Sequence, residues 1–275
     1  MENKPKKSLG QNFLRDEQVL QKIITVAELN SEDFVIEIGP GEGVLTEQLA
    51  KHTKKVIAIE LDDRLIPVLN EKFKNTANVE IVHADILNIN LPELLGHWVS
   101  KGTPSVPISA PILNYKLVAN IPYYITSPII RLFLEQVIQP KEIILMVQKE
   151  VAKRIVATAG QMSLLSVAIQ YYAEVKILFE VSKDSFFPIP KVDSAIIKIT
   201  PIRKFNKITD KKFFRVVKAG FSAKRKTLPN NLGNSLQLDK KDICEKLKTL
   251  SLHENVRAQE LTIVDWKKVS ELILS

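Results

Sequence analysis

Short apolar stretches alternate with helical patterns along the first part of the chain, and this alternation constrains the fold more than any other feature. Each stretch is five or six residues long, as is typical of a buried strand. The expected strands are residues 34–38, 55–60, 79–83, 115–119 and 143–147. Strands that alternate with helices predict an α/β fold whose sheet is doubly wound and mostly parallel.

This pattern changes in two places. Residues 91–113 hold four of the chain's 14 prolines and show little periodicity, so we expect a loop insertion there. Further on, the strand-like residues 175–181 and 194–200 follow one another without a helix between them. Strands joined in this way favour an antiparallel pair, which would close one edge of the sheet.

Beyond residue 209 the pattern is helical only. We therefore expect a first domain over residues 1–204, which begins with a flexible basic arm at about 1–10, and a small all-helical domain over 205–275. The expected helices of the second domain are residues 210–221, 240–250 and 263–274.

Composition limits the setting in which the chain works. Its 275 residues include one cysteine, Cys244, which excludes an internal disulfide, and four histidines whose spacing does not suit a metal site. The longest apolar runs are too short to span a bilayer, and the N-terminus lacks the apolar core of a signal peptide. We expect a cytoplasmic protein without a metal or a membrane partner.

Charge is divided unevenly along the chain. Residues 201–275 contain 17 Lys and Arg against 8 Asp and Glu, whereas the preceding 200 residues contain 22 against 23. A near-neutral body with a basic tail favours a polyanion partner that is bound mainly by the C-terminal part. A basic surface kept for solubility explains the charge equally well.

A glycine-rich stretch, Glu37-Ile-Gly39-Pro-Gly41-Glu-Gly43, leaves the first expected strand and enters a helix. Glycines at such a turn allow positive φ and let the backbone approach a ligand closely. A dinucleotide-binding fingerprint would need a third glycine where Val44 stands. The spacing E-x-G-x-G-x-G is instead the form expected of S-adenosylmethionine sites, although many turns of this kind need glycine for their conformation alone.

Acidic residues end the next two expected strands. Glu60 could accept hydrogen bonds from both ribose hydroxyls of a nucleoside, or lie on the surface beside Asp62 and Asp63. Asp85 could accept from an adenine amino group, or cap a turn. Taken alone, each acid suits a structural role better than a functional one. Their position after the glycine turn, at successive strand ends, favours a ligand site.

The tetrapeptide Asn120-Ile-Pro-Tyr123 follows the fourth expected strand. The Asn carbonyl and a backbone carbonyl can each accept one N–H of an amine-bearing base, Pro122 fixes the local backbone, and Tyr123 offers a stacking face. An ordinary strand end with a proline turn would have the same sequence. Because the glycine turn and both acids precede it at the same edge of the sheet, we interpret all four features as one site.

Several motifs, in matching order, resemble the ribosomal RNA adenine dimethyltransferase family over nearly the whole chain. The resemblance is strongest to bacterial members that dimethylate paired adenosines near the 3′ end of small-subunit (16S) rRNA. The motifs are Gly10-Gln-Asn-Phe-Leu14, Glu37-Ile-Gly-Pro-Gly41, Asn120-Ile-Pro-Tyr123, Gln148-Lys-Glu150, Phe186-x-Pro188-x-Pro190-x-Val192-x-Ser194-Ala195 and Lys224-Arg-Lys-Thr227 with Asn230-Asn-Leu232.

This resemblance implies a Rossmann-like, S-adenosylmethionine-dependent methyltransferase sheet followed by a helical rRNA-binding domain. It implies N6,N6-dimethylation of two adjacent adenosines during ribosome biogenesis, with small-subunit rRNA or the immature 30S subunit as the partner. We expect a monomer. The loop expected at residues 91–113 departs from the family pattern and leaves the motifs intact.

The resemblance also implies a role for individual residues. The methyl donor would be contacted by Asn12, Leu14, Gly39, Gly41, Glu60, Asp85 and Asn120. The target adenine would be held by Asn120, Tyr123 and Phe186. The rRNA phosphates would be contacted by Lys211, Lys212, Arg215, Lys224, Arg225 and Lys226.

Two alternative functions stay open. Dimethylases of large-subunit rRNA have the same catalytic core, and the Lys224-Arg-Lys-Thr227 segment with the long helical tail argues against them. A ribosome-assembly or transcription factor could keep the fold without catalysis, and the intact Asn120-Ile-Pro-Tyr123, Glu60 and Asp85 argue against that.

Overall fold

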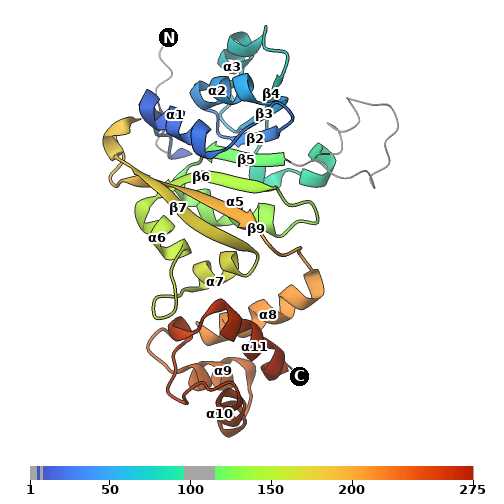
Figure 1. Ribbon diagram of the computed structural model, residues 1–275, viewed down its shortest axis with the longest axis vertical. Helices are drawn as coiled ribbons and strands as arrows, with labels where there is room; N and C mark the ends of the chain where they lie inside the picture. The colour runs from blue at the N-terminus through green and yellow to red at the C-terminus, as the bar shows by residue number, and fades with distance from the viewer. Residues whose placement is uncertain (1–4, 7–8, 96–114, 275) are drawn as a thin grey trace. The chain divides into compact units, whose positions relative to one another are not determined.

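The computed structural model describes residues 5–6, 9–95 and 115–274, which belong to two compact units (Figure 1). The first unit comprises Met1–Ala152 and Lys176–Pro201, and the second comprises Lys153–Val175 and Ile202–Ser275. The last boundary lies close to the predicted one at 204/205. Residues 153–175, however, belong with the C-terminal helices, whereas the sequence placed them in the first domain.

The first unit is built on a seven-stranded sheet in the order β4-β3-β2-β5-β6-β9-β7 (Figure 1). Five of its strands run parallel: β2 Phe34–Ile38, β3 Lys55–Glu60, β4 Val79–His83, β5 Tyr115–Asn120 and β6 Glu142–Gln148. Their bounds agree with the five expected strands to within one residue at each end. The predicted α/β fold with a mostly parallel sheet is therefore confirmed.

The two remaining strands form one edge of this sheet. Strand β9 (Ser194–Pro201) pairs antiparallel with β6, and β7 (Ala173–Val181) is the outermost strand beside it. The expected pair of neighbouring strands at the sheet edge is confirmed. A separate two-stranded sheet joins β1 (Phe13–Leu14) to β8 (Phe186–Phe187), with Leu14 opposite Phe186. It ties the N-terminal segment to the loop between β7 and β9.

Helices connect the strands of the first unit. They are α1 Glu17–Val26, α2 Val44–His52, α3 Ile66–Phe73, α5 Thr126–Leu134 and, at the unit boundary, α6 Lys149–Ile155. The prediction of a loop over residues 91–113 is wrong for its first five residues. Residues 91–95 are helical, and the side chains of Leu91 and Leu95 are buried. Residues 96–114 lie outside the described part of the chain. None of the described helices is long and apolar enough to cross a bilayer.

The strand order creates a crevice between β2 and β5. The chain adds β3 and β4 on one side of β2 and then returns to add β5 on the other side. In open α/β sheets such a switch point is where ligands bind, beyond the carboxyl ends of the strands. The register pairs Ile38 with Ile59, and Ile36 with Leu117. Extending this register brings Gly39, Glu60 and Asn120 to the same edge.

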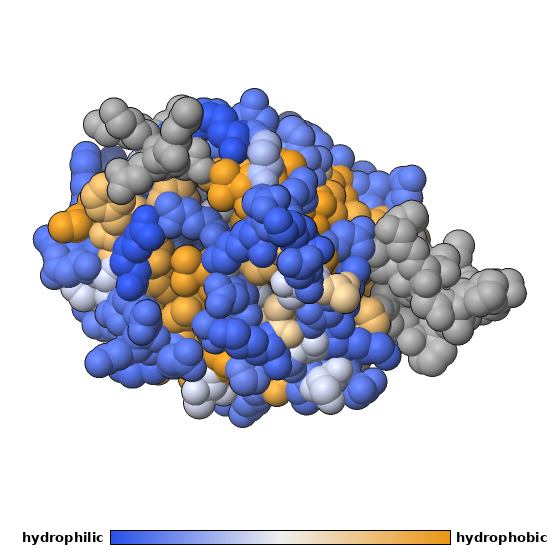
Figure 2. All heavy atoms as spheres, turned by 90° about the horizontal axis from the view of Figure 1, so that it is seen from above, coloured by the Kyte–Doolittle hydropathy of each residue, from blue (hydrophilic) through white to orange (hydrophobic). Residues whose placement is uncertain are grey.

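The central strands are mainly apolar, but some of their buried residues are charged or polar. Their apolar side chains pack into a core with α1 and α2. The face of the molecule shown in Figure 2 is mainly hydrophilic, with hydrophobic patches. One of the buried charged residues is Lys116 in β5, whose side chain is buried. Its Nζ lies 3.1 Å from an Asp33 oxygen and donates to the carbonyls of Ala27 and Glu28. These partners offset the cost of burying the ammonium group.

The second unit is helical, with α7 Leu164–Gln170, α8 Lys207–Gly220, α9 Leu228–Leu236, α10 Lys240–Thr249 and α11 Ile263–Leu274. Tyr171, just after α7, stacks on Phe213 of α8 with ring centroids 3.8 Å apart. Both Tyr171 and Tyr172 donate to the buried carboxylate of Asp210, each at 2.9 Å. These contacts explain why residues 153–175 belong with the C-terminal helices.

Candidate active site

A cavity of about 210 Å³ lies at the carboxyl ends of the parallel strands, in the first unit. The structure brings together on its wall every residue predicted to contact the methyl donor: Asn12, Leu14, Gly39, Gly41, Glu60, Asp85 and Asn120. Tyr123 also lines the cavity. Residues far apart in the chain therefore share the wall of one cavity.

The glycine turn that follows β2 requires glycine at more than one position. Gly39 and Gly41 have φ of +66° and +59°, in the left-handed region that other residues rarely adopt. A β-carbon at Gly41 would also lie 2.9 Å from the ring of Phe13. The turn thus lets Phe13, from the N-terminal segment, pack directly on the backbone of the cavity wall.

Glu60, at the end of β3, is buried with its carboxylate fixed in place. One oxygen accepts from the backbone N–H of Gly41 at 3.1 Å, and the other accepts from that of Asp62 at 2.8 Å. Burial raises the pKa of Glu60 above its usual value, and these backbone hydrogen bonds oppose the rise. Each carboxylate oxygen keeps a further lone pair, so the group can accept from the two hydroxyls of a ribose.

Asp85 both caps a turn and lines the cavity. Its carboxylate accepts from the backbone N–H of Leu87 at 3.0 Å and from the side chain of Asn88 at 2.9 Å, at the start of the 3-10 helix Ile86–Asn88. Asp85 therefore does cap a turn, which is the structural role that its sequence position suggested. The two hydrogen bonds hold the carboxylate at the edge of the cavity, where its remaining lone pairs can accept from a base.

The Asn120 amide is held by the N-terminal segment. Its Nδ2 donates to the carbonyl of Asn12 at 3.2 Å, so Oδ1 remains as an acceptor. The Tyr123 hydroxyl shares a 2.7 Å hydrogen bond with the Ser194 hydroxyl. Burial raises the pKa of Tyr123, so the phenol stays neutral at physiological pH. Asn120 and Tyr123 are thus each oriented by another segment: Asn120 by the N-terminal segment and Tyr123 by the first residue of β9.

Phe186 is placed differently from the other predicted site residues. It is only 3% exposed, packs in the hydrophobic core and is absent from the described residues that line the cavity. Its strand partner Leu14 does line the cavity, and its neighbour Phe187 is 58% exposed. Stacking of Phe186 on the target base therefore stays a prediction.

Three residues at the site were given no role in the sequence analysis. Ser194 and Glu37 belong to family motifs quoted above, and this membership is the only sequence feature that indicates a role for them. Gln11 also stands in a motif, and its side-chain amide donates to Asp62 at 2.9 Å. Asp62 itself was considered only as a surface neighbour of Glu60, but its side chain is buried. No periodicity or spacing distinguishes a buried Asp62 from an exposed Asp63.

Glu37 is a buried carboxyl group in the cavity wall. Its Oε2 has no hydrogen-bond partner among the described residues, and the same is true of the Thr46 hydroxyl. Burial raises the pKa of Glu37 to about 8; the neighbouring Thr46 side chain opposes this rise, and the nearby charge of Glu60 adds to it. The group is therefore mostly protonated and neutral at pH 7, so it can donate one hydrogen bond.

We expect Glu37→Gln to stabilise the protein at pH 8 and to change its stability little at pH 4. Because the folded pKa of about 8 exceeds the ordinary Glu value of 4.5, the stability that Glu37 contributes is complete below pH 4.5 and is lost as pH rises towards 8. A gain of a few kcal/mol at pH 8, or on the order of 10 °C, should appear in thermal unfolding. Equal effects at both pH values would contradict the raised pKa.

The residues predicted to bind RNA lie in the second unit. All six are exposed: Lys211, Lys212, Arg215, Lys224, Arg225 and Lys226. Three belong to α8 and three to the turn before α9, and no ion pair joins any of them to the part of the chain that the structure describes. Their charges are thus available to a polyanion. Within the described residues, no group of His, Cys, Asp and Glu could hold a metal ion.

The site as a whole suits one cofactor. The glycine turn admits a ligand against its backbone, Glu60 can bind a ribose, and Asp85 and Asn120 provide further acceptors on the same cavity. The fold and the site together define the class of S-adenosylmethionine-dependent methyltransferases with a Rossmann-like sheet.

Comparison with known proteins narrows the class to a family. The model of the family "Ribosomal RNA adenine dimethylase" matches residues 2–274, and the chain belongs to this family. It is 43% identical to a Dehalococcoides mccartyi protein over 97% of this chain and 87% of that one, and 42% identical to a Ligilactobacillus salivarius protein over 98% and 90%. Both relatives are named "Ribosomal RNA small subunit methyltransferase A".

Solved structures agree with this assignment. A dimethyladenosine transferase from Plasmodium falciparum is 28% identical, with a TM-score of 0.73 over 94% of this chain and 95% of that one. The 23S rRNA methyltransferase ErmE is 26% identical, with a TM-score of 0.72 over 96% and 100%. The predicted family, fold and S-adenosylmethionine cofactor are confirmed, and the chain is an rRNA adenine dimethyltransferase.

Proposed function

We propose that this protein transfers methyl groups from S-adenosylmethionine to the N6 atoms of two adjacent adenosines near the 3′ end of small-subunit (16S) rRNA. The observation that carries the proposal is the orientation of Asn120. Its Nδ2 is engaged by the Asn12 carbonyl, so its Oδ1 is the acceptor on a cavity that also holds Glu60. The names of relatives at 41–43% identity favour small-subunit over large-subunit rRNA as substrate.

The target amine is a weak nucleophile, because its lone pair is delocalised into the adenine ring. Asn120 Oδ1 and the Ile121 carbonyl would each accept one of its N–H groups, which favours a pyramidal nitrogen and directs the lone pair at the methyl group. The donor supplies a methyl group already activated as a sulfonium. The chain therefore needs chiefly to orient the amine, and the displaced N6 proton can leave to water.

Aromatic side chains would hold the adenine ring. Tyr123, with its hydroxyl fixed by Ser194, offers one face, and Phe186 would offer the other. Stacking of this kind contributes roughly 1–3 kcal/mol per base. An adenine inside a duplex cannot reach such a cavity, so the target must be single-stranded or flipped out.

Mass spectrometry of rRNA digests tests the substrate directly. Small-subunit and large-subunit rRNA, each free and as ribosomal subunits, are incubated with the protein and labelled donor. We expect N6,N6-dimethyladenosine at two adjacent positions of small-subunit rRNA only. Label in large-subunit rRNA would favour the alternative function, a dimethylase of large-subunit rRNA. Donor binding without label in any rRNA would favour a non-catalytic assembly factor.

The basic residues of the second unit predict salt-dependent RNA binding. Changing Lys224, Arg225 and Lys226 together to Ala should lower RNA affinity and reduce the slope of log K against log[salt] by about 2–3, since each phosphate contact contributes about 0.7–0.9. Filter binding over a salt series measures this. The control changes Lys240, Lys241 and Lys248, three exposed residues of α10, to Ala. An equal loss in both variants would indicate a general basic surface rather than a binding patch.

The setting of the reaction follows from the proposed substrate. We propose that the protein acts as a monomer in the cytoplasm, where the immature 30S subunit is assembled. The basic second unit would bind rRNA, and the first unit would carry the chemistry.

A further inference from the structure

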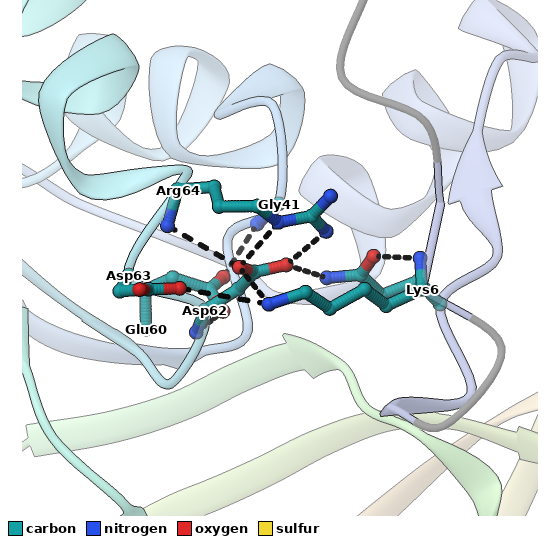
Figure 3. Close-up of polar contacts among 7 residues, drawn as sticks. Lys6, Gly41, Glu60, Asp62, Asp63 and Arg64 are labelled. Carbon is teal, nitrogen blue, oxygen red and sulfur yellow. Dashed lines mark hydrogen bonds and ion pairs between the residues drawn. The ribbon is translucent and has the colours of Figure 1, made fainter.

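The N-terminal segment is tied to the sheet through one buried carboxylate, that of Asp62. Asp62 follows β3 and is 1% exposed. One of its oxygens accepts from Lys6 Nζ at 3.1 Å, and the other accepts from Gln11 Nε2 at 2.9 Å (Figure 3). The Gln11 side-chain oxygen in turn accepts from the backbone N–H of Lys6 at 2.7 Å. Two residues of the N-terminal segment thus converge on one acid.

Arg64 completes the surroundings of this carboxylate. Its Nε and Nη2 donate to the two oxygens of Asp62 at 3.0 and 2.6 Å, and its backbone N–H donates at 3.3 Å (Figure 3). Hydrogen bonds from Arg64, and then from Gln11 and Lys6, hold the pKa of Asp62 well below its usual range. The group stays charged at any physiological pH, so its grip on the segment does not depend on pH.

Asp62 also contacts the predicted ribose acceptor. Its backbone N–H donates to Glu60 Oε1 at 2.8 Å, beside the bond from Gly41 to the other oxygen (Figure 3). Asp62 therefore helps to orient Glu60 through its main chain, while its side chain holds Gln11. The Asp62 side chain is absent from the described cavity wall, so it acts on the site through its neighbours.

The segment held by Asp62 reaches the other half of the site. Gln11 is followed by Asn12, whose carbonyl accepts from Asn120 Nδ2, and by Phe13, whose ring covers the backbone of Gly41. A shift of Gln11 would move the carbonyl that orients the Asn120 amide. A continuous chain of contacts thus runs from Asp62 to the amide that is proposed to bind the target amine.

We propose that Asp62 is a positioning residue that sets two geometries at once: that of Glu60 on the donor side and, through Gln11 and Asn12, that of Asn120 on the acceptor side. The inference rests on the proposed function, because it assigns the two sides to donor and target. Asp62 itself touches neither. Misplacement of reacting groups by a remote change can cost up to about 100-fold in rate.

The test compares Asp62→Asn with Gln11→Ala and Asp63→Asn in the full chain. Asp62→Asn keeps the shape of the side chain and removes the charge that Lys6, Gln11 and Arg64 share. Gln11→Ala removes the hydrogen bonds of the Gln11 side chain to Asp62 and to the Lys6 backbone, and leaves the charge of Asp62 in place. Asp63→Asn is the matched control, because the Asp63 side chain is 73% exposed and its 3.5 Å ion pair with Lys6 is screened by water.

Three readouts separate positioning from general loss of stability. Hydrogen exchange without donor should show faster exchange at residues 9–14 in Asp62→Asn and Gln11→Ala, with α11 unchanged. Calorimetry should show S-adenosylmethionine binding about tenfold weaker in Asp62→Asn and nearly normal in Gln11→Ala. At saturating donor, kcat should fall about tenfold or more in both variants. Asp63→Asn should match the unchanged chain throughout.

The outcomes distinguish this inference from the proposed function. Unchanged exchange at residues 9–14 together with unchanged donor affinity in Asp62→Asn overturns the positioning role. If Asp62→Asn does not fold, exchange and kcat in Gln11→Ala decide the matter, since Gln11 lies outside the central sheet. Failure of the unchanged chain to bind the donor or to methylate small-subunit rRNA would instead overturn the proposed function, whatever the exchange data show.

Discussion

Replacing Asn120 with Ala should lower kcat for rRNA methylation on the order of 100-fold or more, with a much smaller effect on donor affinity. The amide oxygen of Asn120 is the proposed acceptor for the target N6–H, and alanine has no side-chain acceptor in its place. Its loss removes an interaction that strengthens as the amine becomes pyramidal, which is the kind of interaction that affects kcat. Single-turnover methylation with a saturating labelled donor measures the effect.

The control for this variant is Asn70→Ala on α3, an exposed asparagine outside the cavity wall. It should methylate normally. S-adenosylhomocysteine binding by calorimetry should show that Asn120→Ala still forms the donor pocket. Turnover within a few-fold of the unchanged chain would remove Asn120 from the mechanism, and an equal loss of donor binding and turnover would assign it to the donor pocket alone.

Replacing Glu60 with Gln should weaken donor binding by about 10- to 100-fold, since hydrogen bonds to charged groups contribute about 1.5–3 kcal/mol. Both Glu60 oxygens already accept from backbone N–H groups, of Gly41 and Asp62. The Gln side chain keeps one acceptor oxygen, so one buried N–H loses its partner and a ribose hydroxyl loses its acceptor. Calorimetric titration with S-adenosylmethionine measures the change.

The expected pattern for Glu60→Gln is a raised KM for the donor with kcat largely recovered at saturation, because the group binds the donor away from the transferred methyl. Asp63→Asn again serves as the control for loss of a carboxylate at the same strand end. A lowered kcat at saturating donor with an unchanged dissociation constant would place Glu60 at the reacting atoms instead of the ribose.

Local patterns in the chain were sufficient to predict the parallel sheet and the main site. The five parallel strands are short, mainly apolar runs between helical or polar stretches, so their limits could be predicted to within one residue. The glycine turn, Glu60, Asp85 and Asn120 each lie at or just beyond the carboxyl end of one of these strands. Since the carboxyl ends of parallel strands meet at one edge, their convergence on one cavity could be expected.

Elements without a clear apolar period were missed. Helix α9 contains Pro229 and Gly233, which weaken its helical pattern. Its polar residue Asn231 is buried, and the side chain donates to the carbonyls of Gly220 and Ala223. Residues 153–175 were assigned to the first domain because they precede two strands. Their true partners, Phe213 and Asp210, are about forty residues further along the chain, and no local pattern indicates such contacts.

The sequence by itself determined the family, the parallel sheet and most of the residues on the cavity wall, because these depend on periodicity and on motifs whose members lie close together in the chain. Only the tertiary structure decided which polar groups are buried and what they bind. Asp62 and Asp63 are neighbours of identical chemistry, yet one is enclosed by Lys6, Gln11 and Arg64 and the other faces solvent. Burial is a property of the packed chain, and two of the partners that enclose Asp62, Lys6 and Gln11, are more than fifty residues away from it in the sequence.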